Sequence, residues 1–121
     1  MKGARRFDTV DFRKKETSVR AGAVEWELDE DATIHGFGAW WKCTLVPGVV
    51  LSTSPDAPAT HWEQIILPLF EPLQCKKGDT LQLHLTSDTR YKTGLRVRWE
   101  ISLRRAGKVV SVQKIDTRKG E

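Results

Sequence analysis

The sequence predicts an all-β protein, an antiparallel β-barrel or barrel-like sandwich built as a single domain. Three observations lead to this prediction: short segments alternate between apolar and polar residues, turn signals separate them at even spacing, and no segment has apolar residues at the 3.6-residue spacing of an amphipathic helix. A chain of 121 residues is long enough to bury one core. Closure into a barrel would remove exposed strand edges.

The predicted β domain covers residues 24–115, between an N-terminal segment (residues 1–23) and a polar tail (residues 116–121). The N-terminal segment contains a weak edge strand over Phe7–Phe12. The first clear strand is Val24–Leu28, where apolar and acidic residues alternate as they do in a half-buried strand.

Thr33–Leu45 is predicted as one long strand, rich in β-branched and aromatic residues and bent at its glycines. In a regular strand Trp40 and Trp41 point to opposite faces, so we expect one indole in the core and the other at the surface. Val46-Pro47-Gly48 predicts a type II turn, with proline and glycine at its central positions, and Val49–Leu51 returns as the next strand.

In the second half, Pro68 is expected to end the strand that begins at Glu63 or to place it at an edge. Lys76–Asp79 and Arg104–Lys108 are predicted turns. The remaining predicted strands are Leu73–Cys75, Leu81–Thr86, Val97–Leu103 and Val109–Ile115.

Composition narrows the possible functions. The net charge is +4, but basic and apolar residues alternate, as in Arg96–Trp99, which is typical of a solvated sheet face. No apolar run reaches the ~20 residues of a membrane helix, so we expect no membrane binding and a cytoplasmic location, or a nuclear one in a eukaryote. Cys43 and Cys75 are interpreted as buried or partly buried thiols, and the spacing of His35 and His84 does not suit a metal pair, so we expect no metal site.

The candidate site is the loop from Ser52 to Gln64, in which two prolines restrict the backbone. It carries a hydroxyl, an imidazole and an indole side by side, at Thr60, His61 and Trp62. A histidine exchanges protons near neutral pH, and an indole can stack on a guanidinium. From these residues alone, a loop-stabilising hydrogen bond is the favoured role for His61, and a functional role is the alternative.

Several features follow one another in a distinctive order: the run Ile34–Trp41, the segment Leu51–Pro55 leading to Thr60-His61-Trp62, Gln64 at the start of a strand, and the turn Lys76–Asp79 before two alternating strands. This order of features from His35 to Leu103 resembles the C-terminal barrel of the protein arginine methyltransferases. The resemblance spans roughly Val24 to Leu103.

By this resemblance, His61 has a catalytic role, because the matching histidine of the family reaches the active site and pairs with an acidic residue of the cofactor domain. The matching tryptophan lines the substrate-arginine pocket, which implies a substrate-binding role for Trp62. Thr60 is placed in the same substrate-binding site, where its hydroxyl is expected to fix the loop through local hydrogen bonds. Glu63 departs from the family, which commonly has a lysine there.

The resemblance also implies S-adenosylmethionine as the cofactor of the complete enzyme, a separate domain that binds it in cis or in trans, and an arginine-containing protein or peptide as substrate. The sequence has no strand followed by a glycine-rich turn and no loop with the two glutamates that clamp the substrate guanidinium in this family. We therefore expect this chain to bind no cofactor and to be inactive alone. The oligomeric state is left open.

Two other functions remain open from the sequence. A stand-alone module with five tryptophans and a positive charge could hold single-stranded nucleic acid or a peptide, although its basic residues are dispersed and no nucleic-acid motif occurs. A structural, self-associating barrel is the third possibility.

Overall fold

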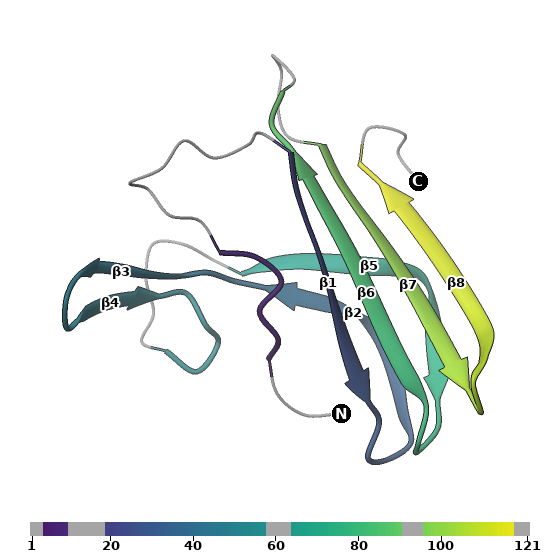
Figure 1. The fold of residues 1–121 in the computed structure, drawn as a ribbon. Coiled ribbons are helices and arrows are strands. Elements are labelled where there is room, and N and C mark those ends of the chain that lie inside the picture. Colours follow the sequence, from purple (N-terminus) through teal and green to yellow (C-terminus); the bar gives the residue numbers. More distant parts are fainter. Residues whose placement is uncertain (1–3, 10–18, 58–63, 91–95, 118–121) are drawn as a thin grey trace. The chain divides into compact units, whose positions relative to one another are not determined.

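The computed structural model describes residues 4–9, 19–57, 64–90 and 96–117. In these ranges all regular secondary structure is strand, and the reported strand pairs are antiparallel, which confirms the predicted fold class (Figure 1). None of the described segments forms a helix long and apolar enough to cross a membrane. The strands are β1 (Val19–Glu27), β2 (Ala32–Ala39), β3 (Lys42–Val46), β4 (Val49–Ser52), β5 (Ile65–Cys75), β6 (Thr80–Asp88), β7 (Arg96–Arg105) and β8 (Lys108–Asp116).

The described strands form three sheets, and the chain divides into two compact units. One sheet has four strands in the order β1-β6-β7-β8, and β2-β5 and β3-β4 form two-stranded sheets. The first unit contains residues Met1–Ile34 and Phe70–Glu121, and the second contains His35–Leu69.

The first unit contains the four-stranded sheet β1-β6-β7-β8 (Figure 1). One face of this sheet is buried, as the alternation in β6 and β7 predicts. Leu81 lies opposite Trp26 on one side and Leu103 on the other, and Leu83 lies opposite Ile101. On the other face of β6, His84 is exposed and its neighbours Gln82 and Thr86 are partly buried. The core of this unit comprises Trp26, Leu28, Ile34, Leu73, Cys75, Leu81, Leu83, Leu85, Trp99, Ile101, Leu103 and Ile115.

Two tight turns at one end of this sheet follow the predicted turn chemistry. Ala106 and Gly107 connect β7 to β8, and both have positive φ (52° and 77°), as the central residues of a type I′ hairpin do. Gly78 has a φ of 90° in the turn from Lys76 to Asp79, where the Asp79 amide donates to the Lys76 carbonyl at 3.0 Å. Both turns lie at their predicted positions.

The N-terminal residues 4–9 lie along β1 without forming a strand. Arg20 donates from Nε to Asp8 Oδ2 at 2.8 Å and from Nη2 to the Thr9 carbonyl at 2.8 Å. The backbone of Phe7 runs so close to β1 that a Cβ at Gly22 would lie 2.0 Å from the Phe7 carbonyl oxygen. Glycine is therefore required sterically at this contact. The remaining part of the predicted edge strand, residues 10–12, lies outside the described ranges.

The side chain of Gln113 on β8 makes hydrogen bonds with backbone groups of β5, as the backbone of a neighbouring strand would. Its Oε1 accepts hydrogen bonds from the amides of Phe70 (2.9 Å) and Glu71 (3.3 Å), and its Nε2 donates to the Glu71 carbonyl at 2.9 Å. Polar backbone groups of β5 are thereby satisfied by a side chain from another strand.

In the second unit, the strand predicted over Thr33–Leu45 is interrupted, and the one-strand prediction is wrong. β2 ends at Ala39 and β3 begins at Lys42, with Trp40 and Trp41 between them. Both indoles are partly exposed (37% and 39%), so the expectation that one lies in the core is also wrong. The Thr53 amide donates a hydrogen bond to the Trp41 carbonyl at 3.0 Å. The backbone of Trp41 is therefore held in place, although the pairing of β3 with β4 begins one residue later, at Lys42.

The hairpin β3-β4 forms as predicted, around Pro47 and Gly48. Gly48 has a φ of 83°, the value that the second central position of a type II turn requires. β5 continues through Pro68 to Cys75 rather than ending at the proline. It belongs to a two-stranded sheet, so the alternative expectation, an edge position for Pro68, is confirmed.

Candidate functional site

The predicted site residues Thr60, His61 and Trp62 lie outside the described residues, as does Glu63. The roles given to them therefore stay predictions. The structure describes both ends of the segment that carries them, Ser52–Ala57 after β4 and Gln64 before β5, and both ends belong to the second unit.

Thr53 holds the first end of this loop against the backbone of Trp41. Its hydroxyl accepts from the Trp41 amide at 3.0 Å and donates to the Trp41 carbonyl at 3.2 Å, and its own amide donates to the same carbonyl at 3.0 Å. The residue is only 2% exposed. A buried threonine with a fully used hydroxyl fixes the direction in which the chain leaves β4.

Gln64 closes the loop from its other end. Its Nε2 donates to the Thr53 carbonyl at 2.6 Å, so two residues eleven positions apart in sequence are in direct contact. Thr53 and Gln64 were not predicted in this role. The available sequence signal is weak: a hydroxyl residue directly after an apolar strand and an amide residue directly before the next strand.

The residues after Thr53 form a turn that starts the loop. The Ala57 amide donates to the Ser54 carbonyl at 3.0 Å, with Pro55 at the first central position. The hydroxyls of Ser52 and Ser54 accept from backbone amides two residues further on, at 3.2 and 3.3 Å. This part of the loop is thus held by local hydrogen bonds, as the serine and proline content predicts.

Four Arg–Asp pairs in the first unit account for the large electrostatic shifts of the described residues. Arg105 donates to Asp79 and lowers the pKa of that carboxyl to about 2, and Arg90 does the same for Asp88. Asp8 has a pKa below its usual value because it accepts hydrogen bonds from Arg20. Arg96 and Asp116 form the fourth pair. The carboxylates of Asp8, Asp79 and Asp88 stay ionised and paired at neutral pH, so their role is to hold strands and turns together rather than to transfer protons.

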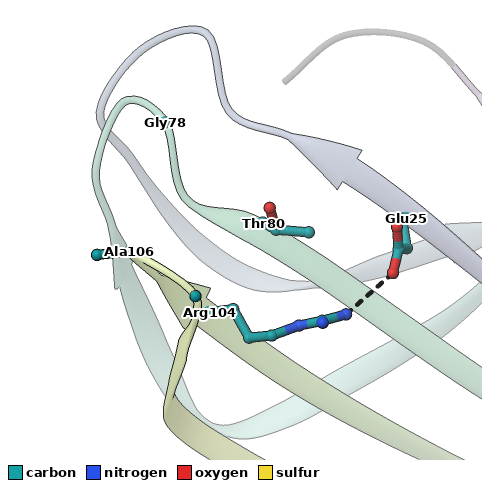
Figure 2. A pocket seen from close by; sticks show the side chains of 6 residues that line it. Glu25, Gly78, Thr80, Arg104 and Ala106 are labelled. Atoms are coloured by element: carbon teal, nitrogen blue, oxygen red, sulfur yellow. Dashed lines mark hydrogen bonds and ion pairs between the residues drawn. The ribbon is translucent and has the colours of Figure 1, made fainter.

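A shallow pocket of about 350 Å³ lies at one end of the four-stranded sheet. Figure 2 shows the side chains of Glu25 and Arg104 directed toward each other beside Thr80, and Arg104 Nη2 donates to Glu25 Oε1 at 3.0 Å. Because its carboxylate and its guanidinium neutralise each other, the pocket offers no unbalanced charge to a charged substrate. The lining residues are Glu25, Gly78, Thr80, Arg104, Ala106 and Gly107.

Within the described ranges, no three His, Cys, Asp or Glu side chains gather closely enough to hold a metal ion. Cys43 is partly buried and Cys75 is buried, both as free thiols, which confirms the interpretation from the sequence. Burial raises the pKa of the Cys75 thiol. In the same ranges no strand is followed by a helix, so the strand–turn–helix unit that binds the phosphate or nucleoside of a cofactor does not occur there.

The comparison with protein families decides which family this fold belongs to. Residues 3–107 match the sequence model of the arginine methyltransferase oligomerization subdomain. The chain belongs to the arginine methyltransferase family. The match covers all the strands from β1 to β7 and both ends of the Ser52–Gln64 loop, so the resemblance seen in the sequence is confirmed for the C-terminal barrel domain.

Relatives within this family come from bacteria, animals and plants. The chain is 36% identical over 55 residues to an arginine N(omega)-methyltransferase of Streptomyces achromogenes subsp. streptozoticus, covering 46% of this chain and 15% of that protein. It is 32% identical over 66 residues to human protein arginine N-methyltransferase 2, covering 50% of this chain and 15% of that protein. It is 33% identical over 87 residues to protein arginine N-methyltransferase 6 of Xenopus laevis, covering 67% of this chain and 25% of that protein. The matches thus span between 15% and 25% of these relatives' own length.

Proposed function

We propose that this domain supplies the loop with Thr60, His61 and Trp62 to a substrate-arginine site that a separate S-adenosylmethionine-binding domain completes. In this proposal Trp62 stacks on the substrate guanidinium and Thr60 contributes to the same surface. His61 orients an acidic group of the cofactor domain. The chain alone does not transfer methyl groups.

The observation that carries the proposal is the closed base of this loop within the residues that match the family. Gln64 bonds to Thr53, and Thr53 bonds to Trp41, so the loop leaves and re-enters the domain at one fixed place within the residues that match the family. Functional groups on a loop held by a rigid scaffold are a common arrangement for binding and catalysis.

The cofactor belongs to a different domain in this proposal, which lies in the same protein or in a partner. The described residues lack a strand–turn–helix unit, and the relatives are several times longer than the matched region. The expected substrate is an arginine-containing protein or peptide. We also propose a cytoplasmic location, or a nuclear one in a eukaryote, which imaging of a fluorescent fusion in the source cell tests.

The test uses a protein in which this chain is joined to an S-adenosylmethionine-binding domain of the family. We expect His61→Ala to lower methyl transfer to an arginine peptide about tenfold or more, and Trp62→Ala to lower kcat/KM by about 2- to 30-fold, the loss of about 0.5 to 2 kcal/mol of cation–π stacking. His84→Ala is the matched control, because His84 is an exposed histidine on β6. Activity that survives both loop substitutions at the level of the control would refute the proposal.

A second function, self-association, is favoured by the hairpin β3-β4. Its apolar side chains Leu45, Val46, Val49 and Val50 are 48–59% exposed. No charged residue lies between Cys43 and Leu51. The matched family model describes an oligomerization subdomain, which is consistent with a second copy of the chain as the partner.

Sedimentation velocity over a concentration series tests this second function. We expect the parent chain to form dimers and Val49→Lys to shift it toward monomer, since a charge on the apolar hairpin opposes its burial. Val110→Lys, at a residue of similar exposure (51%) on β8, is the control and should behave as the parent does. A parent chain that remains monomeric throughout the series would contradict self-association.

A further inference from the structure

We infer that Thr53 is the positioning residue of the Ser52–Gln64 loop. The hydrogen bond from the Gln64 side chain to the Thr53 carbonyl, called the latch below, holds the two ends of this loop together. Neither residue is assigned a role by the family match or by the predicted site. The inference rests on the proposed function in one respect only: the loop that these two residues hold is the one that carries Thr60, His61 and Trp62.

Thr53 is suited to this role because all its polar atoms point to the two segments that frame the loop. The amide and the hydroxyl bond to the backbone of Trp41, at the start of the hairpin, while the carbonyl accepts from Gln64, at the end of the loop. One residue therefore connects the chain before the hairpin, the start of the loop and the end of the loop. At 2% exposure, water does not replace these bonds when they break.

The latch restricts where the loop residues lie. Gln64 follows Trp62 by two positions and His61 by three. Because Gln64 is the described residue that directly follows this segment, the bond from its side chain to Thr53 fixes the point at which the segment with His61 and Trp62 rejoins the domain. An error of about 1 Å in such a residue is enough to lower catalysis substantially.

Two substitutions separate a positioning role from simple packing. Thr53→Val keeps the shape of the side chain and removes the hydroxyl, whereas Thr53→Ser keeps the hydroxyl and removes a methyl group. If Thr53 only filled space, valine would be tolerated better than serine. If the hydroxyl positions the loop, the order is reversed, because the valine leaves the Trp41 amide without its acceptor.

Hydrogen exchange of backbone amides in this chain, resolved by residue, is the first measurement. For the Asp56 and Ala57 amides, which donate hydrogen bonds in the turn that starts the loop, we expect about tenfold faster exchange in Thr53→Val and in Gln64→Leu, the loss of about one hydrogen bond's stabilisation. Thr53→Ser and the control Thr44→Val should exchange as the parent does. Thr44 receives the same substitution in the same hairpin, but it is exposed. Exchange in β6 and β7 should not change in any variant.

Gln64→Leu keeps the test decisive if Thr53→Val does not fold, since Gln64 is exposed. Parent-like exchange of the Asp56 and Ala57 amides in Gln64→Leu, or valine tolerated better than serine at position 53, would overturn the inference.

The second measurement uses the protein joined to a cofactor domain. Thr53→Val is expected to reduce kcat/KM for the arginine peptide by about tenfold, as a misplaced loop would. Its Kd for S-adenosylmethionine should not change, and Thr53→Ser should restore the rate. If His61→Ala and Trp62→Ala leave the rate intact while exchange still responds to Thr53→Val, the proposed function fails and the positioning role stands. The two ideas are therefore tested separately.

Discussion

Asp79 offers the sharpest test of how this domain is held together. Its carboxylate is 2% exposed and accepts from Arg105 Nε at 2.9 Å, from Arg105 Nη2 at 2.8 Å and from the Lys76 amide at 2.8 Å. These bonds tie the turn before β6 to the end of β7. We predict that Asp79→Asn lowers the free energy of unfolding at pH 7 by about 2 kcal/mol, the range for hydrogen bonds to a charged group.

The pH dependence follows from the lowered pKa of Asp79. Arg105 and the backbone reduce it from 3.8 to about 2, and full conversion of that difference would give about 2.4 kcal/mol. The Arg105 side chain is 37% exposed, and solvent screening reduces the contribution to about 1 kcal/mol. Because the folded pKa lies below the unfolded one, this stabilisation is complete above pH 4 and is lost as the pH falls through 2.

Urea denaturation from pH 7 to pH 2 measures both quantities. The difference between the parent and Asp79→Asn should narrow by about 1 kcal/mol between pH 5 and pH 2. Glu25→Gln is the matched control, because Glu25 pairs with Arg104 at side-chain exposures of 53% and 39%. We expect this control to lower the free energy of unfolding by less than about 0.5 kcal/mol. If Asp79→Asn costs no more than this control, or if the difference does not change with pH, the reasoning is wrong.

Two further substitutions test contacts between segments distant in the sequence. Gln113→Leu should lower the free energy of unfolding by about 1–3 kcal/mol, because the backbone groups of Phe70 and Glu71 lose a shared partner. Gln82→Leu, on the outer face of β6, should cost less than about 0.5 kcal/mol, and equal losses for the two would contradict the bridging role. Gly22→Ala should displace residues 4–9 from β1, seen as a loss of the nuclear Overhauser contacts between Phe7 and Gly22, since the new methyl would lie 2.0 Å from the Phe7 carbonyl oxygen. Gly38→Ala is the control: nothing lies within 4 Å of a Cβ at Gly38, so the spectrum should change only for residues next to position 38. A Gly22→Ala spectrum that retains the Phe7 contacts would show that the close approach is not maintained in solution.

The parts of the fold that were predictable from the sequence depend on local rules. Apolar residues at every second position placed the core faces of β6 and β7, because the side chains of a strand alternate between faces. The turn at Pro47-Gly48 was predictable because proline fixes φ and glycine tolerates a positive φ. In both cases the residue itself carries the constraint.

The parts that were not predictable depend on contacts between distant segments. Trp40 and Trp41 favour strands, so nothing local indicates that the strand breaks there. The role of Thr53 depends on the backbone of Trp41, twelve residues earlier, and that of Gln113 on β5. β5 runs through Pro68 and Pro72 because it pairs in a two-stranded sheet, a fact of topology rather than of composition.

The most direct test of the proposed function is the rate of methyl transfer with and without the Trp62 indole. In a protein that joins this chain to an S-adenosylmethionine-binding domain, kcat/KM for an arginine peptide is measured for the parent, Trp62→Ala and the control His84→Ala. We predict that Trp62→Ala alone loses about 2- to 30-fold in kcat/KM while its Kd for S-adenosylmethionine stays at the parent value. Equal kcat/KM in all three proteins would contradict a substrate site that includes this loop.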